Sequence, residues 1–211
     1  MIEPHTRRKY ELPYYAELKQ IHVELGQLRA ATDRLAHKYI DVREANPALC
    51  DNHMELVEKV YENFNQINLT VINGETLPYT SDVKERIRRK EELLYNKPTE
   101  DYANSYFEKI IQQFKAPATR IRITKLKPGK EIPFHIDYDP SYATRIIIPV
   151  YTHPLVINEF KVRNQVHRCH LEAGKAYFLN TGFAHAVFNR SSEHRIALMF
   201  SLDGQQDLEF L

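Results

Sequence analysis

Hydrophobic and polar positions follow two different periods along the chain. Before residue 119, apolar side chains recur mostly at three-, four- and seven-residue steps, which is typical of one face of an amphipathic helix. Helices are predicted over residues 16–40, 52–67 and 101–114, a charged helix or exposed loop over 81–96, and a strand over 67–73.

From residue 119 onwards the period changes to two, as expected for strands whose successive side chains point to opposite faces. Glycine follows the same division, because only Gly26 and Gly74 fall in the first 128 residues and four glycines follow them. Such a density of short strands predicts a sandwich or a small barrel. Six strands are predicted, over residues 119–126, 144–151, 154–162, 175–181, 185–190 and 194–202.

Together the two patterns predict an α+β chain. Residues 1–118 are expected to be a mainly helical N-terminal part, and residues 119–211 a β core. The helices are expected to pack on the outside of the core and not to form an independent domain, since amphipathic helices need an apolar partner surface. A homodimer formed through the helices stays open as an alternative.

Charge and cysteine content narrow the classes of function. The formal net charge of +1 provides no basic surface for nucleic acid or for a membrane. The first 15 residues lack the apolar core of a signal peptide, and no stretch has the roughly 20 apolar residues of a membrane span. The two cysteines, Cys50 and Cys169, do not make a disulfide framework. The chain is therefore expected to be cytoplasmic.

The stretch PFHIDYDP, residues 133–140, contains candidate metal ligands. In a strand, His135 and Asp137 point to the same side and can bind one ion. The pair alone is a weak signal, because a polar strand end has the same appearance. Two histidines and one carboxylate on one octahedral face form the site of non-haem Fe(II) oxygenases, so a third ligand is required. Two later histidines are candidates for this third ligand. His185 follows a glycine turn at the start of a β-like run, and His194 precedes another such run.

An arginine favours His185 over His194 as the third ligand. Arg195 follows His185 by ten residues, which is enough for a strand, a turn and a returning strand. The planar guanidinium binds carboxylates through two hydrogen bonds and keeps its charge when buried. These are the properties needed to anchor the distal carboxylate of 2-oxoglutarate, so His185 and Arg195 are predicted together.

Three segments carry a family resemblance: RITKLKPGKEIPFHID, TRIIIPV and GKAYFLNTGFAHAVFNRSSEHRIALMFSL. They resemble the core of 2-oxoglutarate- and Fe(II)-dependent dioxygenases, closest to the aspartyl/asparaginyl β-hydroxylase and free-proline hydroxylase type. The resemblance covers about residues 119–203. It implies a double-stranded β-helix core, that is, a cupin-like jelly roll, with Fe(II), 2-oxoglutarate and O2 as cofactor and cosubstrates.

The resemblance also assigns roles to individual residues. It implies iron ligands at His135, Asp137 and His185, with Arg195 as the partner of the distal 2-oxoglutarate carboxylate. Thr124 falls where the family places a hydroxyl residue beside the cosubstrate. Arg145 matches a strand arginine expected to contact a carboxylate of cosubstrate or substrate.

Departures and competing interpretations remain. Some β-hydroxylases have glycine at the position of Asp137, and Ile147 stands where the family has a histidine that helps to hold 2-oxoglutarate. Asp139 competes with Asp137 as ligand, but Pro140 ends the strand and favours a turn role for Asp139. The histidines and cysteine of VHRCH, 166–170, would suit zinc but lack a second half-site.

The predicted function is hydroxylation of an aliphatic C–H bond of an amino acid, free or within a peptide or protein. The carboxylate of Asp137 favours hydroxylation over halogenation, since related halogenases lack that ligand. Desaturation or epimerisation would use the same site. The alternative from another class is a non-catalytic, cupin-like metal-binding or scaffold protein.

Overall fold

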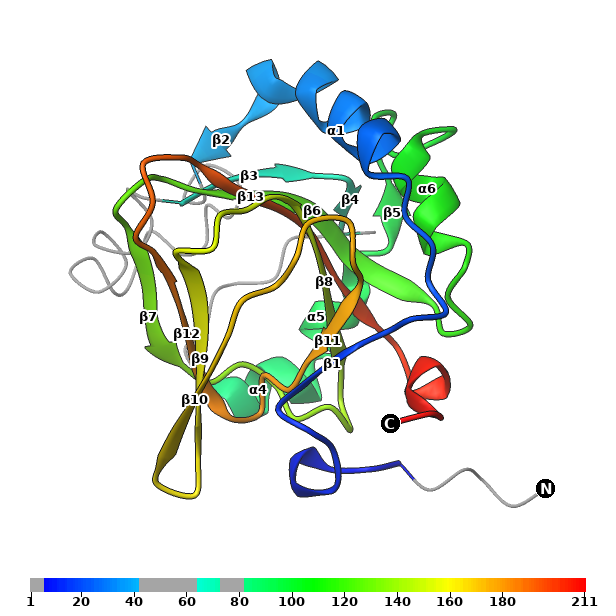
Figure 1. Cartoon of the computed structure of the whole chain (residues 1–211). Helices are drawn as coiled ribbons and strands as arrows, with labels where there is room; N and C mark the ends of the chain where they lie inside the picture. Colours follow the sequence, from blue (N-terminus) through cyan, green and yellow to red (C-terminus); the bar gives the residue numbers. More distant parts are fainter. Residues whose placement is uncertain (1–5, 42–63, 73–81) are drawn as a thin grey trace.

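The computed structural model describes residues 6–41, 64–72 and 82–211 (Figure 1). Its centre consists of eight consecutive strands in two facing antiparallel sheets. These strands are β6 (Ala118–Leu126), β7 (Glu131–His135), β8 (Thr144–Tyr151), β9 (Val156–Val162), β10 (Gln165–Cys169), β11 (Tyr177–Leu179), β12 (Ala184–Asn189) and β13 (Arg195–Leu202).

The chain passes repeatedly from one sheet to the other. Strands β11, β8, β13 and β6 are neighbours in the larger sheet, and β10, β9, β12 and β7 form the smaller one. This order is that of a cupin-like double-stranded β-helix, which confirms the predicted fold class. All six strands predicted after residue 119 are present, with ends shifted by up to two residues.

Strands from the N-terminal part extend the larger sheet to seven strands. On one edge β1 (Tyr15–Glu17) pairs with β11, and on the other β3 (Phe64–Asn68) pairs with β6. The short β2 (Ile40–Asp41) follows on β3, while β4 (Thr70–Val71) and β5 (Lys97–Pro98) form a separate two-stranded sheet. The described N-terminal residues therefore complete the larger sheet as well as covering it.

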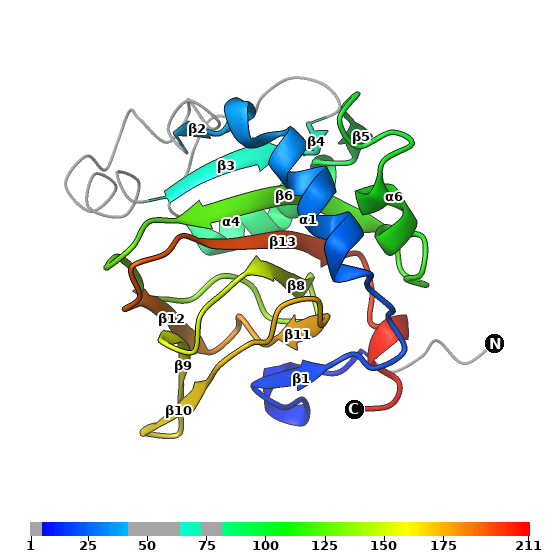
Figure 2. The same cartoon turned by 45° about the horizontal axis from the view of Figure 1, so that its top comes forward.

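Helices α1 (Leu25–Arg34) and α6 (Tyr106–Ile111) lie on the outer face of the larger sheet (Figure 2). Leu28 of α1 and Ile110 of α6 are fully buried in one core with strand residues such as Ile123 and Leu198. Burying a leucine or isoleucine side chain stabilises the fold by about 1.5–3 kcal/mol. The expected position of helices outside the core is therefore found.

Two of the helix predictions are wrong in detail. Within 16–40, only Leu25–Arg34 is α-helical, and Leu18 instead donates its backbone N–H to Ala176 O beside the sheet. Leu18 and Ile21 are buried by this sheet contact, so their helical spacing is coincidental. Of the predicted helix 52–67, residues 52–63 lie outside the described part, and 64–67 belong to β3.

The remaining predictions for this part are partly confirmed. Segment 67–73 contains the end of β3 and then β4, with residue 73 outside the described part. Segment 81–96 contains the short helices α4 (Val83–Arg88) and α5 (Glu91–Leu94). A division at residue 118 stays a prediction. None of the helices in the described ranges is long and apolar enough to cross a bilayer.

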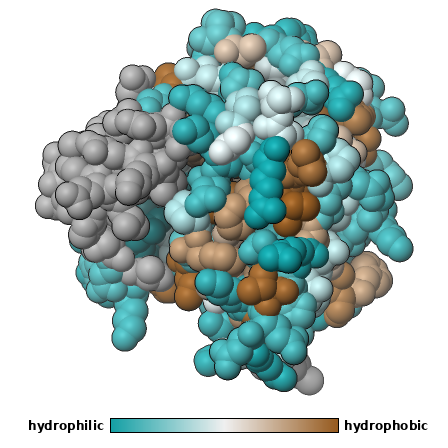
Figure 3. Space-filling view, turned by 60° about the vertical axis from the view of Figure 1, so that its left-hand side comes forward, coloured by the Kyte–Doolittle hydropathy of each residue, from teal (hydrophilic) through white to brown (hydrophobic). Residues whose placement is uncertain are grey.

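On the face shown in Figure 3, hydrophobic side chains lie in small groups among hydrophilic ones. Among the described residues, the exposed large hydrophobics are scattered along the sequence, including Tyr10, Ile136, Val166 and Phe210. Isolated exposed apolar residues are normal for a monomeric surface. The homodimer stays a prediction.

Candidate metal centre

Three predicted ligands meet between the two sheets. His135 ends β7 and is directly paired with His185 of β12, and their ring centroids are 4.2 Å apart. Asp137 follows β7 by two residues, and its Oδ1 is 3.8 Å from His135 Nε2. One ligand atom from each residue lies within 4.8 Å of the other two. This is the spacing expected of groups that share one ion.

Both imidazoles are fixed in the same way. The Nδ1 of His135 is 2.8 Å from the carbonyl oxygen of Pro133, and the Nδ1 of His185 is 3.0 Å from that of Phe183. A carbonyl can only accept, so Nδ1 carries the proton in each ring and Nε2 keeps its lone pair. Such outer contacts set the tautomer and orientation of metal-binding histidines.

The surroundings favour the ligand protonation states. Burial lowers the pKa of His185 to about 4 despite the opposing effect of Asp137, so this ring is neutral at neutral pH. Burial opposes ionisation of Asp137, but Arg145 and the two histidines together outweigh it and lower the pKa of the carboxyl group to about 2. Neutral imidazole and ionised carboxylate are the forms that bind metal ions.

Arg195 and Thr124 lie next to each other on β13 and β6. Arg195 is 4% exposed, and its Nη1 donates to Thr124 Oγ1 at 3.3 Å. Within the described ranges, no carboxylate forms an ion pair with Arg195. Burial alone lowers the pKa of this guanidinium to about 10, so it is charged at neutral pH. A buried cation without an anion indicates a place for an anionic ligand.

Arg145, on β8, points into the same interior but has protein partners. Its Nη2 is 3.0 Å from Glu92 Oε1 and 3.5 Å from Asp137 Oδ2. Its Nη1 is buried and has no hydrogen-bond partner among the described residues. The predicted contact of Arg145 with a ligand carboxylate would therefore be made through Nη1.

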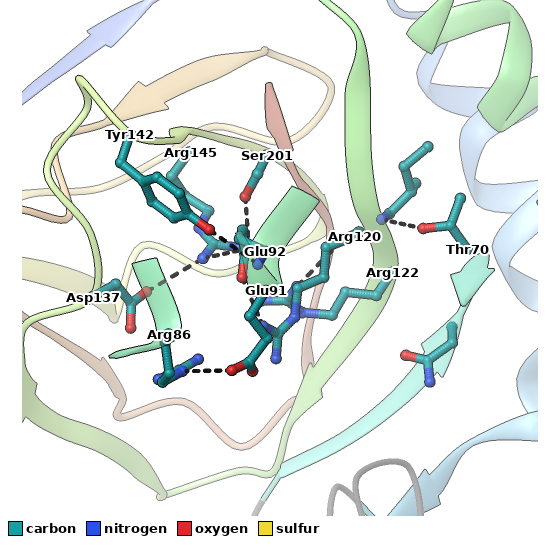
Figure 4. Close-up of polar contacts among 12 residues, drawn as sticks. Thr70, Arg86, Glu91, Glu92, Arg120, Arg122, Asp137, Tyr142, Arg145 and Ser201 are labelled. Atoms are coloured by element: carbon teal, nitrogen blue, oxygen red, sulfur yellow. Dashed lines mark hydrogen bonds and ion pairs between the residues drawn. The ribbon is translucent and has the colours of Figure 1, made fainter. Parts of the chain in front are cut away.

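Glu92 is the site residue that sequence analysis missed. It lies on α5, in a segment predicted to be exposed, yet its side chain is fully buried between β6, β8 and β13 (Figure 4). Its Oε2 accepts a hydrogen bond of 2.6 Å from Arg120, and its Oε1 one of 2.7 Å from Ser201. No local sequence signal could have identified it, because its partners are 28 to 109 residues away.

The competing metal-site interpretations do not match the described contacts. Asp139 Oδ1 accepts a hydrogen bond from the backbone N–H of Ser141 at 3.0 Å, as a turn residue does. His167 stacks on Tyr14, and His170 Nδ1 contacts Val156 O. In the described part of the chain, the only cluster of three potential ligands is His135, Asp137 and His185.

A facial set of two histidines and one carboxylate inside a double-stranded β-helix defines a class, the non-haem Fe(II) oxygenases. The donor set and the Nε2 lone pairs fit Fe(II), and Arg195, which has no carboxylate partner among the described residues, fits a dicarboxylate cosubstrate. Comparisons with known proteins identify the family within this class.

The sequence model of the aspartyl/asparaginyl β-hydroxylase family matches residues 96–204, more than half of the chain. The protein belongs to this family. It is therefore an Fe(II)- and 2-oxoglutarate-dependent dioxygenase of the hydroxylase type, with Fe(II), 2-oxoglutarate and O2 as cofactor and cosubstrates. No curated protein sequence matches the chain.

Solved structures show more distant similarity. A 2-oxoglutarate–Fe(II) oxygenase family oxidoreductase from Burkholderia pseudomallei is 12% identical with a TM-score of 0.48, covering 86% of this chain and 79% of its own. A Pseudomonas putida prolyl-4-hydroxylase is 11% identical with a TM-score of 0.46, covering 90% and 92%. A cupin domain from Bordetella pertussis Tohama I is 16% identical with a TM-score of 0.32, covering 40% and 80%.

Proposed function

We propose that this protein hydroxylates an aliphatic C–H bond of an amino acid, free or within a peptide or protein. The observation that carries the proposal is Arg195, a buried cation that has a hydroxyl neighbour but no anionic partner among the described residues. It lies on the strand that follows the His185 strand in the chain, as a cosubstrate anchor would.

His135, Asp137 and His185 are the proposed ligands of Fe(II). When bound, Fe(II) with 2-oxoglutarate supplies the activation of O2 that C–H hydroxylation requires, with succinate and CO2 as co-products. The two Nε2 atoms and the Asp137 carboxylate would hold the ion, and a set of only three protein ligands would leave room for small ligands.

Arg195 and Thr124 are proposed to bind the distal carboxylate of 2-oxoglutarate. The guanidinium can donate two hydrogen bonds to the carboxylate. The threonine hydroxyl, which donates to Ala197 O at 3.3 Å in this structure, can turn to donate a third. Apolar side chains close the space nearby: Phe160 stacks near His185 at 6.2 Å, and Ile147 and Ala197 are buried in the same cluster. These side chains exclude water, which strengthens the charge interaction.

A second cationic position supports a substrate that carries a carboxylate. Arg122 is 8% exposed on β6, and its Nη1 donates to Arg120 O at 3.2 Å. It forms no ion pair with any residue in the described ranges. Together with the unpartnered Nη1 of Arg145, it provides hydrogen-bond donors that a carboxylate of the substrate can satisfy.

A succinate-release screen across free amino acids and short peptides tests this function. At least one compound is expected to raise succinate release above the rate without substrate, and Asp137→Ala is the blank. Blocking the carboxylate of the active compound as its methyl ester or amide should abolish the stimulation. Fe(II) bound at 1:1 without a visible charge-transfer band on anaerobic addition of 2-oxoglutarate would contradict the oxygenase mechanism.

A further inference from the structure

Glu92 connects the metal centre to a cluster of buried arginines. Its carboxylate contacts Arg145 at 3.0 Å and Arg120 at 2.6 Å, and Ser201 holds it from a third side. Figure 4 shows these contacts converging on Glu92 from different strands. The side chain therefore has one well-defined position, fixed by three elements of the larger sheet.

The contact with Arg145 extends to a proposed iron ligand. Arg145 Nη2 lies between Glu92 Oε1 and Asp137 Oδ2, so one amino group is shared by two carboxylates. Because Oδ2 faces the guanidinium, Oδ1 is the Asp137 oxygen that faces His135. Glu92 thus fixes the arginine that fixes the orientation of the ligand carboxylate.

Charge balance depends on the same residue. Arg120, Arg122 and Arg145, here called the arginine cluster, surround two carboxylates, Glu92 and Asp137; Arg122 and Arg145 are buried and Arg120 is partly buried. The nearby Arg86 and Glu91 form their own pair at 3.4 Å. Without Glu92, Asp137 would be the one carboxylate left to offset the guanidinium groups of this cluster, and their excess positive charge opposes the binding of a divalent cation.

We propose that Glu92 is a positioning residue of the metal centre, which acts on Asp137 through Arg145 and offsets the charge of the arginine cluster. This inference rests on the proposed metal role of His135, Asp137 and His185. Glu92 lies outside residues 96–204, the part of the chain that the family model matches.

Mn(II) titration of the whole chain tests the inference, because Mn(II) suits the same nitrogen and oxygen ligands and can be followed by its free-ion EPR signal. Glu92→Gln keeps the size of the side chain and removes its charge. It is expected to raise the Mn(II) dissociation constant about 10-fold, as loss of outer partners of metal ligands does.

Glu159→Gln is the matched control. Glu159, on β9, is also buried and forms an ion pair with one arginine, Arg168, at 2.7 Å. Within the described part of the chain it forms no ion pair with a member of the arginine cluster. Its variant should change the Mn(II) dissociation constant less than about twofold.

The variant Arg120→Gln distinguishes an effect of charge on metal binding from damage to the fold. Arg120 contacts Glu92 but not Asp137, so its removal leaves Glu92 free to neutralise Arg145 more fully. Mn(II) binding should become tighter in Arg120→Gln, and the double variant Glu92→Gln/Arg120→Gln should recover most of the affinity lost in Glu92→Gln. A purely structural role predicts losses in both single variants and a larger loss in the double variant.

The outcomes separate this inference from the metal centre itself. If the wild type binds Mn(II) at 1:1 and Glu92→Gln binds equally well, the role of Glu92 is wrong and the centre stands. If Glu92→Gln fails to fold, a folded double variant with wild-type affinity supports the inference, and one with a 10-fold loss overturns it. A wild type that binds no Mn(II) contradicts the centre.

Discussion

Asp137 and Asp139 are two residues apart but have entirely different partners. Asp137 Oδ2 lies 3.5 Å from the guanidinium of Arg145, whereas Asp139 accepts hydrogen bonds from the backbone N–H groups of Ser141 and Lys9 at 3.0 and 3.4 Å. The first carboxylate therefore faces the interior between the sheets, and the second stabilises a turn.

Asp137→Ala is expected to weaken Mn(II) or Fe(II) binding by more than about 100-fold, because a proposed ligand is lost and not only a neighbour of one. Asp139→Ala is the matched control. It should keep metal affinity and cost about 1 kcal/mol of unfolding free energy, the usual contribution of a hydrogen bond. Metal titration and urea unfolding measure the two effects. Equal metal loss in both variants would show that the wrong carboxylate was assigned.

Arg195→Ala should weaken 2-oxoglutarate binding far more than metal binding. Hydrogen bonds to charged groups contribute about 1.5–3 kcal/mol, so the dissociation constant should rise roughly 10- to 100-fold. Isothermal titration with 2-oxoglutarate on the Mn(II)-loaded chain measures it. Arg190→Ala changes an exposed arginine in the connection between β12 and β13 and should have no effect.

Thr124→Val tests the hydroxyl beside Arg195 with little change of volume. The loss of 2-oxoglutarate affinity should have the same sign as in Arg195→Ala and be smaller, about fivefold, since one neutral hydrogen bond is removed. Thr119 is on the same strand and is also buried, so Thr119→Val serves as the control. A loss in Thr119→Val as large as in Thr124→Val would contradict a specific role for the Thr124 hydroxyl.

Acid should destabilise the protein partly through Glu92. Burial opposes ionisation of this carboxyl group, but Arg120 and Arg145 outweigh burial and hold its pKa well below the ordinary 4.5. The unfolded chain therefore binds this proton before the folded chain does. The resulting stability is present above pH 4.5 and is lost as the pH falls towards the folded pKa.

Glu92→Gln removes this titration. Its unfolding free energy should depend less steeply on pH than that of the wild type between about pH 5.5 and 3.5, measured by urea unfolding. Identical slopes in the two proteins would mean that the pKa of Glu92 is not depressed in the folded state.

Asn189 organises the turn between His185 and Arg195. Its buried side-chain amide donates to Lys127 O at 3.1 Å and to Glu193 O at 2.8 Å, and its Oδ1 accepts from the Ser191 hydroxyl at 2.6 Å. Asn189→Ala leaves these buried groups without partners and should cost about 3 kcal/mol of unfolding free energy. Ser192→Ala, at an exposed position of the same turn, should cost less than about 0.5 kcal/mol.

The sequence was sufficient for the β core and for the gathering of the proposed ligands. Strand alternation places His135 and Asp137 on one side. The ten residues between His185 and Arg195 were interpreted as a hairpin, but β12 and β13 lie in different sheets and do not pair. Thr124 was predicted to lie beside the cosubstrate from the family resemblance alone, and the pairing of β6 with β13 places it beside Arg195. The roles of these residues stay predictions, while their proximity is observed.

Long-range pairing explains what the sequence could not predict. Residues 15–21 have helical spacing, yet β1 is held by β11, more than 150 residues later. Glu92 lies among charged neighbours that indicate a solvated helix, and only the folded chain brings Arg120, Arg145 and Ser201 around it. Such tertiary contacts override local preference and leave no periodic signal.

The connection between β12 and β13 passes from the smaller sheet to the larger one, with Asn189 as its last β12 residue and Arg195 as its first β13 residue. It therefore sets how far the guanidinium of Arg195 lies from the imidazole of His185. The proposed cosubstrate site runs from the metal ion that His185 would hold to the guanidinium of Arg195, so the cosubstrate has to match that separation. This connection between the sheets thus limits the chain length of the cosubstrate, and a dicarboxylate one methylene shorter or longer than 2-oxoglutarate is expected to lose one of its two attachments.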